Sequence, residues 1–170
     1  MISDGFSDDD LERLQVLQAL EGYADLGLLD LAWAELKRLR QAHPDGLEVI
    51  EAELLLLMRE QRWTEAIVTG RRLCNEAPDR PWGFIHTAYC LHEAGATAEA
   101  LRTLRSGPEA LQEEALFHYN LGCYLAVLGD TEAALEALVA AFALDESLER
   151  TARTDPDLAA LRLDEESADE

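Results

Sequence analysis

Apolar residues recur along most of the chain at intervals of three and four positions, the spacing that places them on one face of a helix. Near the C-terminal end this series includes Leu121, Leu125, Leu128, Leu135 and Leu138. A sustained alternation of apolar and polar residues, which would indicate a β-strand, is nearly absent. The pattern therefore predicts an all-α chain.

Small residues repeat with a period of 34 positions, which is the signature of a repeat architecture. The repeat consists of four alanines, each preceded five positions earlier by a glycine or, once, a glutamine: Ala32, Ala66, Ala100 and Ala134, with Gly27, Gln61, Gly95 and Gly129. A glycine at this position suits a tight turn between two helices, because a positive φ costs it little. The alanine lets the two helices approach closely. Each block is therefore predicted to be a helix pair.

The pattern resembles the tetratricopeptide repeat (TPR), whose 34-residue unit carries an aromatic residue, Leu-Gly, Tyr, Ala and a closing proline. The last block fits best, with Tyr119-Asn120-Leu121-Gly122 followed by Gly129 and Ala134, and Pro44 and Pro78 close the first two blocks. The resemblance implies an all-α fold, an α-α superhelix or right-handed solenoid of about four helix pairs. Its blocks are 13–46, 47–80, 81–114 and 115–148, which together cover 136 of the 170 residues.

The ends of such an array need caps, because a stack of repeats exposes an apolar face at each end. We expect residues 1–12 to contain the start of the first helix, with Ser7 as its N-cap before three aspartates. A C-terminal capping helix is expected over 149–163, followed by an acidic tail over 164–170.

The third block departs from the repeat pattern at its end. Gly107 stands where a small helical residue is usual, and Pro108 follows it directly. Since proline cannot continue a helix, the second helix of this block should stop near Ser106. The next helix is then expected to begin early, near Glu109.

Charge and composition narrow the classes of partner. With 14 Lys and Arg against 35 Asp and Glu, the net charge is −21, which argues against nucleic acid and anionic membrane surfaces as partners. No apolar run reaches the length of a membrane span, and the first residues lack the features of a signal peptide. Three cysteines form an odd, sparse set that suits a reducing compartment. These features favour a cytoplasmic protein.

Catalytic chemistry is not indicated. The sequence contains no phosphate-binding glycine loop, nucleophile elbow or dinucleotide fingerprint. His86 and Cys90 lie four apart on one predicted helix, and His118 and Cys123 lie in the next block, and residues of these types could bind a metal if they converged. The repeat register instead places Cys90 between packed helices, where it serves as a small apolar residue. We therefore expect no enzyme activity, no cofactor and no metal.

In TPR proteins the first helix of each repeat lines a concave face that binds peptides or partner segments. The repeat register places His92 on this face. Asn120 matches the asparagine with which TPR proteins hydrogen-bond the backbone of a bound peptide. Aromatic anchors at such positions are typical of binding hot spots, whereas the alternative is that Trp82 and Tyr119 pack against adjacent helices. The predicted partner-binding residues are Leu17, Glu21, Glu51, Leu55, Met58, Trp82, Ile85, His86, Tyr89, Leu116, Tyr119, Asn120 and Cys123.

The hypothesis with most support is an adaptor or scaffold that binds a segment of another protein. The expected segment is apolar or aromatic and, because the chain is so acidic, has basic character. The face lacks the Lys and Arg cluster with which some TPR proteins bind acidic chaperone tails, so that activity is not expected. The alternatives are a small acidic chaperone of the secretion type and a self-associating, homo-oligomeric structural subunit.

Overall fold

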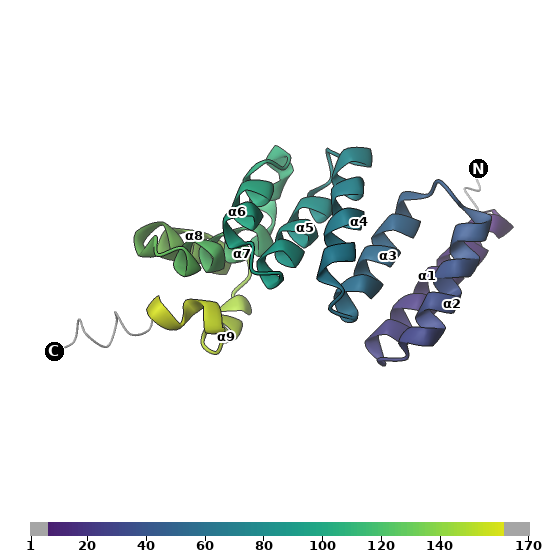
Figure 1. The fold of residues 1–170 in the computed structure, drawn as a ribbon, viewed down its shortest axis with the longest axis horizontal. Coiled ribbons are helices and arrows are strands. Elements are labelled where there is room, and N and C mark those ends of the chain that lie inside the picture. The colour runs from purple at the N-terminus through teal and green to yellow at the C-terminus, as the bar shows by residue number, and fades with distance from the viewer. Residues whose placement is uncertain (1–6, 162–170) are drawn as a thin grey trace, which may run out of the picture. The chain divides into compact units, whose positions relative to one another are not determined.

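The computed structural model of the chain describes residues 7–161, and every regular element within them is a helix (Figure 1). The all-α prediction is therefore confirmed. In chain order, the elements are α1 (Asp8–Asp25), α2 (Leu29–Ala42), α3 (Leu47–Arg59), α4 (Trp63–Glu76), α5 (Pro81–Glu93), α6 (Thr97–Arg105), η1 (Glu109–Glu113), α7 (Ala115–Val127), α8 (Thr131–Leu144), α9 (Leu148–Ala152) and η2 (Pro156–Leu158).

The chain divides into two compact units, residues 1–73 and residues 74–170. The division falls inside α4, between Leu73 and Cys74. Unit 1 holds α1, α2, α3 and most of α4, and unit 2 holds the elements from α5 onward. Each unit has its own buried residues and is described separately below.

Unit 1 is built around the antiparallel pair α1 and α2. Ala32, Leu36 and Leu39 form the buried stripe of α2 and pack with Val16 and Leu20 of α1 in one apolar cluster. Their spacing of three and four residues is the one that the sequence pattern predicted. Burial of this stripe, rather than intrinsic helix propensity, therefore holds the pair together.

The first helix starts as predicted. The Ser7 hydroxyl accepts a hydrogen bond from the Asp10 backbone N–H at 3.1 Å, and the Ser7 backbone N–H donates to the Asp10 carboxylate at 3.3 Å. This reciprocal arrangement is a capping box, which satisfies two backbone donors that the helix leaves free. Hydrogen bonds from Ser7 lower the pKa of Asp10 from its ordinary value.

The turns inside the helix pairs have the left-handed backbone that the repeat pattern predicted. Gly27, Gly95 and Gly129 have φ values of 72°, 81° and 85°, and Gln61 takes the same conformation at 56°. Gln61 is the one non-glycine residue with positive φ in the part of the chain that the structure describes. After it, Arg62 pairs with Glu60 at 2.9 Å and with Glu65 at 2.6 Å, so charged side chains bracket this turn.

Unit 2 contains the pairs α5–α6 and α7–α8, and α7 also contacts α5. Gly122 of α7 is buried against α8, where an added Cβ would lie 2.8 Å from Leu138 and 3.2 Å from the backbone oxygen of Ala134. The helix α6 ends at Arg105, as the Gly107-Pro108 sequence predicted. The next helix does not begin early: α7 starts at Ala115, and Glu109–Glu113 form the separate 3-10 segment η1, because the backbone of Glu114 between them is extended.

The C-terminal segment differs from the single capping helix expected over 149–163. It consists of α9 and η2, separated by a turn, and continues as helix through residue 161. The reason is local, since the Asp155 side chain accepts from the Asp157 N–H at 3.0 Å and Pro156 occupies the first turn of η2. This geometry starts a new helix instead of extending the old one. The predicted acidic tail, 164–170, lies outside the described residues.

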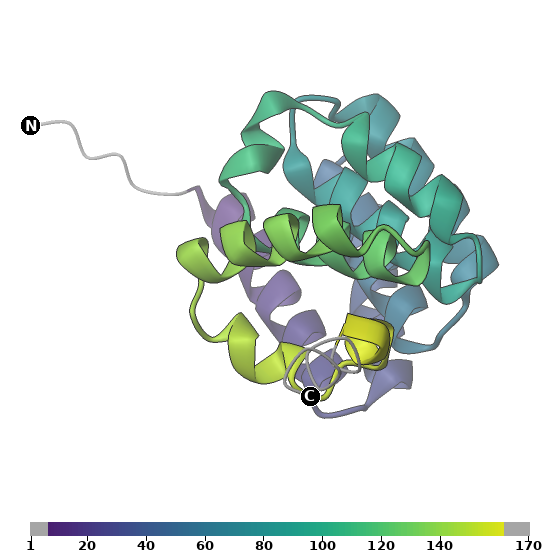
Figure 2. The same cartoon turned by 90° about the vertical axis from the view of Figure 1, so that its left-hand side faces the viewer.

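The segment turns back onto unit 2, as the yellow ribbon shows in Figures 1 and 2. The helix α9 contacts α8, and η2 contacts α7. Leu148, Leu158 and Leu161 are buried, with 9%, 3% and 6% of their surfaces exposed. The segment therefore contributes to the apolar core of unit 2.

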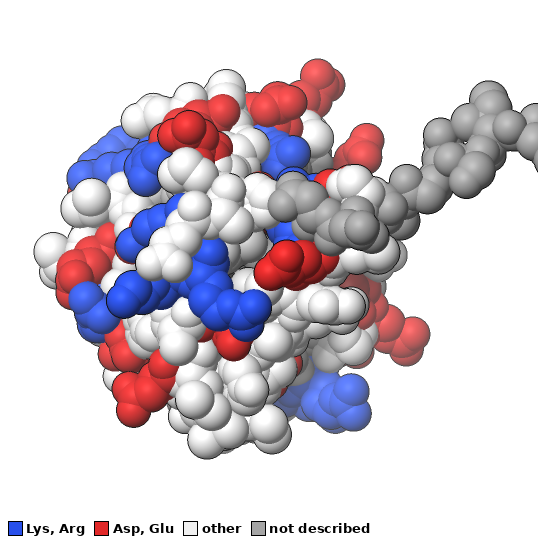
Figure 3. All heavy atoms as spheres, turned by 90° about the vertical axis from the view of Figure 1, so that its right-hand side faces the viewer, with Lys and Arg blue, Asp and Glu red and all other residues white. Residues whose placement is uncertain are grey.

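The surface carries both signs of charge despite the net charge of −21. Figure 3 looks onto the α1 and α2 end and shows Lys and Arg side chains gathered there among acidic ones. On α2, Arg38 pairs with Glu35 at 2.8 Å, and Arg40 pairs with Glu53 of α3 at 2.9 Å. Within residues 7–161, no helix is long and apolar enough to cross a membrane.

Candidate partner-binding face

The candidate residues of unit 2 lie on α5 and α7, and two of them are open to solvent. Trp82 of α5 is 58% exposed and Leu116 of α7 is 45% exposed. The Trp82 ring lies against the imidazole of His86, with the ring centroids 4.7 Å apart. Because it is unfavourable to expose large apolar side chains to water, Trp82 and Leu116 are the residues of this face best suited to contact another protein.

Three other candidate residues of unit 2 are almost inaccessible to solvent. Ile85, Tyr119 and Cys123 are buried, with 5%, 6% and 3% of their surfaces exposed. The Tyr119 hydroxyl donates a hydrogen bond of 2.7 Å to the Asp155 carboxylate, and the Cys123 thiol lies 3.8 Å from the same oxygen. In this structure Tyr119 and Cys123 therefore contact the chain's own C-terminal segment. The remaining candidates of unit 2, His86, Tyr89 and Asn120, are half-buried.

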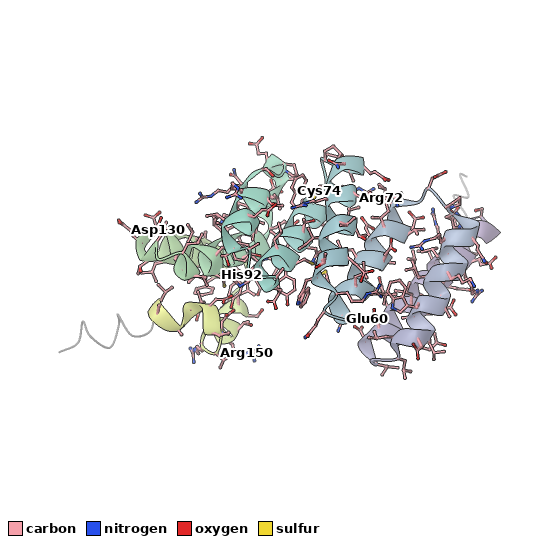
Figure 4. The ribbon with its side chains drawn as sticks, viewed as in Figure 1. Glu60, Arg72, Cys74, His92, Asp130 and Arg150 are labelled. Atoms are coloured by element: carbon pink, nitrogen blue, oxygen red, sulfur yellow. The ribbon has the colours of Figure 1, made fainter. Side chains whose placement is uncertain are left out.

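A second carboxylate of the same segment is bound by His92 of α5 (Figure 4). Its Nε2 lies 2.9 Å from the Asp157 carboxylate, and its Nδ1 lies 3.0 Å from the Thr97 hydroxyl. Because a carboxylate accepts, Nε2 carries a proton and donates it in this hydrogen bond. The imidazole also stacks on Tyr124 with the ring centroids 4.9 Å apart. The turn between α9 and η2 is thus bonded to both α5 and α7.

The sequence placed His92 on this face but did not reveal its carboxylate partners. Asp155-Pro156-Asp157 has the residues of a helix start, with an aspartate N-cap before a proline, and this signal could have identified η2. Its docking on α7 could not have been found in this way, because Asp155 lies 36 positions from Tyr119 and Asp157 lies 65 positions from His92.

Burial keeps the hydroxyl and thiol groups of this face protonated. Removal from water raises the pKa of Tyr119, Cys123 and Tyr124 above their ordinary values, and the carboxylates of Asp155 and Asp157 add to the effect. Burial likewise raises the pKa of Cys90 to about 12. These groups therefore serve as neutral hydrogen-bond donors at neutral pH, and none is an activated nucleophile.

Cys123, Asp155 and Asp157 bring their ligand atoms within 4.8 Å of one another, and they form the one such metal-ligand group among residues 7–161. In this structure Asp155 and Asp157 already accept hydrogen bonds from Tyr119, Cys123 and His92. The arrangement is therefore explained by carboxylates bound to neutral donors. Of the histidines considered from the sequence, His118 donates to the Gln112 carbonyl at 2.9 Å.

Acidification should weaken unit 2 through His86. Burial lowers the pKa of His86 to about 4 from 6.5, so the folded protein holds it neutral while the unfolded chain protonates it. Since the unfolded state binds more protons between these values, the free energy of unfolding should fall by about 2 kcal/mol from pH 7 to pH 5. In urea titrations at both pH values, His86→Gln should remove most of this loss. An unchanged loss in the variant would show that other groups cause it.

The candidates of unit 1 divide in the same way. Leu17 and Leu55 are half-buried and pack against the apolar cluster of α1, α2 and α3. Glu21 is exposed, and Glu51 and Met58 are half-buried. Near them on α3, Arg59 pairs with Asp25 of α1 at 2.7 Å. Among the candidates of unit 1, Glu21 alone is exposed, and none is an exposed aromatic residue.

The sequence matches no protein-family model and no curated protein. Among solved structures, the chain is similar to several structures of MamA. The structure of MamA residues 41 to the end from Desulfovibrio magneticus RS-1 gives a TM-score of 0.67 at 15% identity, over 82% of this chain and 78% of that one. A MamA AMB-1 structure gives 0.65 at 21% identity, over 86% and 84%. A MamA RS-1 double mutant gives 0.66 at 15% identity, over 88% and 80%.

At these identities the likeness establishes the fold. MamA proteins are TPR-like helical proteins, and the pairs α1–α2, α5–α6 and α7–α8 follow the 34-residue pattern found in the sequence. The predicted fold class is therefore confirmed: the chain has the all-α, TPR-like fold of the MamA structures.

Proposed function

We propose that the chain is a protein–protein interaction adaptor that binds a partner segment on the α5–α7 face of unit 2. The observation that carries this proposal is the exposure of Trp82 and Leu116 on helices whose other candidate residues are buried or half-buried. Large apolar side chains beside half-buried polar groups are typical of binding hot spots. The TPR-like fold supports the proposal, since it presents such helices side by side.

The segment that fits this surface has an apolar or aromatic residue to cover Trp82 and Leu116. Neither α5 nor α7 contains Lys or Arg, so the face itself supplies no cation. Asn120 of α7 is half-buried and has both a donor and an acceptor for the backbone of a bound segment. At long range, the negative charge of the whole chain would favour partners that carry basic residues outside the bound segment.

We also propose that the role is binding rather than catalysis, and that it is carried out in the cytoplasm. The buried thiol and hydroxyl groups on the face are protonated, so they suit hydrogen bonding better than nucleophilic attack. Cys74, Cys90 and Cys123 are free thiols in this structure, which suits a reducing compartment.

The test compares the full chain with Trp82→Ala/Leu116→Ala as baits for affinity capture from a native lysate, followed by direct titration of the partner identified. Loss of both anchors should weaken binding by at least about tenfold. The matched control is Val68→Ala/Val139→Ala, which removes equally exposed apolar groups from α4 and α8. Equal weakening by both variants, with both folded by circular dichroism, would overturn the proposal.

A second copy of the chain is the other candidate partner, and one observation favours it. The helix α8 exposes Leu135, Val139 and Leu144 by 43%, 68% and 52%. An apolar surface on the last helix pair is what a further helix layer would cover. In the same experiment, the bait could capture a second copy of the chain itself. If Val68→Ala/Val139→Ala lost this capture and Trp82→Ala/Leu116→Ala retained it, α8 would be the interface.

A further inference from the structure

The inner side of unit 2 contains a group of donors that we call the carboxylate site: His92 on α5, and Tyr119, Cys123 and Tyr124 on α7. Three of them converge on two carboxylates. Tyr119 and Cys123 lie 2.7 Å and 3.8 Å from one oxygen of Asp155, and His92 lies 2.9 Å from Asp157. The site thus holds two acidic side chains, two positions apart, with a hydroxyl, a thiol and an imidazole.

Residues 155–161, which we call the strap, lie on this site. Besides its two carboxylates it buries Leu158, which is 3% exposed in the η2 element that contacts α7. Its polar contacts and its apolar anchor come from four consecutive residues, Asp-Pro-Asp-Leu. Such a combination of charged contacts and one buried side chain is how short peptides are recognised by grooves between helices.

The strap leaves one donor of the site unused. The Tyr124 side chain is 1% exposed, and its hydroxyl has no hydrogen-bond partner in the part of the chain that the structure describes. Burial raises the pKa of this hydroxyl, and the nearby Asp157 carboxylate adds to the effect, so the hydroxyl keeps its proton and can donate. A buried hydroxyl without a partner is unfavourable, so the strap is an incomplete occupant of the site.

We infer that the strap is an internal ligand, and that the partner binds by displacing it with an acidic segment of the form Asp-x-Asp-Leu. This inference deepens the proposed function and rests on it, because the site lies on the same two helices as Trp82 and Leu116. The partner segment would bind with its acidic pair at the carboxylate site and an apolar residue farther along its chain on the exposed anchors, since Trp82 lies ten residues from His92 on α5. Free unit 2 is then autoinhibited.

Two physical effects shape this binding. A tethered ligand has an effective concentration in the millimolar range, so an external segment must compete with it until the strap is released. The net charge of −21 also repels an acidic segment at long range, whereas the contacts within the site are short and shielded from ions. Affinity for the acidic segment alone should therefore rise with salt.

The test measures, by fluorescence anisotropy, the binding of a fluorescein-labelled peptide with the sequence of residues 153–161 to the full chain. In the strap-open variant, Asp155→Asn/Asp157→Asn/Leu158→Ala, the peptide should bind at least about tenfold more tightly than to the unaltered chain. Adding Tyr119→Phe to this variant should weaken binding about fivefold, since one donor to a carboxylate is lost. Affinity should increase between about 0.05 M and 0.3 M salt.

The matched control is the same peptide with asparagine at the positions of Asp155 and Asp157, which should bind at least about tenfold more weakly. Equal binding of the two peptides, or equal binding of the acidic peptide to the closed and open chains, would overturn the inference. If the triple variant fails to fold, Leu158→Ala alone opens the strap and the same comparison applies. Failure here with a partner still lost on Trp82→Ala/Leu116→Ala would leave the proposed function intact.

Discussion

Replacement of Gly122 by valine is expected to destabilise unit 2 by about 3 kcal/mol. A Cβ at this position would lie 2.8 Å and 2.9 Å from Leu138 side-chain carbons and 3.2 Å from the backbone oxygen of Ala134. The leucine side chain can rotate, but the backbone oxygen belongs to α8 and moves only if the whole helix moves. The pair α7–α8 would therefore separate, which chemical denaturation followed by circular dichroism would report.

The control for this prediction is Gly22, which also lies within a helix but, unlike Gly122, has open space around it. Gly22 of α1 has no atom within 4 Å of an added Cβ. Gly22→Ala should therefore stabilise unit 1 by up to about 1 kcal/mol, because alanine has the higher helix propensity. If Gly122→Val and Gly22→Ala changed the free energy of unfolding equally, the close approach of α7 and α8 described here would be wrong.

Truncation of Leu20 to alanine should be nearly as costly, at about 3 kcal/mol. Leu20 of α1 is 0% exposed and packs with Leu36 and Leu39 of α2 in the apolar cluster of unit 1. Removing it loses buried apolar surface and leaves a cavity between two helices that are held together mainly by this cluster. The midpoint of urea unfolding, with an unchanged slope, measures the effect.

The same truncation at Leu14 serves as the matched control. Leu14 lies on the same helix but is 40% exposed, so Leu14→Ala should cost less than about 1 kcal/mol. The ratio between the two variants tests which face of α1 is buried. A loss at Leu14 as large as that at Leu20 would mean that α1 packs in another orientation.

Local features of the fold could be predicted from the sequence because each depends on a few neighbouring residues. Glycines at a period of 34 predicted turns with positive φ, and Ser7 before three aspartates predicted the start of α1. Gly107-Pro108 predicted the end of α6. Gln61 shows the strength of the pattern, since it adopts the glycine conformation without being glycine.

The candidate face could be predicted only in part, because the exposure of a residue depends on what covers it. The repeat register placed Trp82 and Tyr119 on equivalent helices, and nothing in their own sequence distinguishes them. The structure shows Trp82 58% exposed and Tyr119 6% exposed, because the C-terminal segment folds back onto α7. A turn centred on Asp155-Pro156 directs that segment, and its destination depends on contacts with residues far away in the sequence.

Site-specific photo-cross-linking tests most directly whether partners bind the α5–α7 face. A photoreactive residue is placed in the full chain at position 82 on α5 and, in a second protein, at position 139 on α8, two positions of similar exposure. On irradiation in a native lysate, position 82 should capture a partner that position 139 does not. Capture of the same partner from position 139 alone would contradict binding at the α5–α7 face and move the interface to α8.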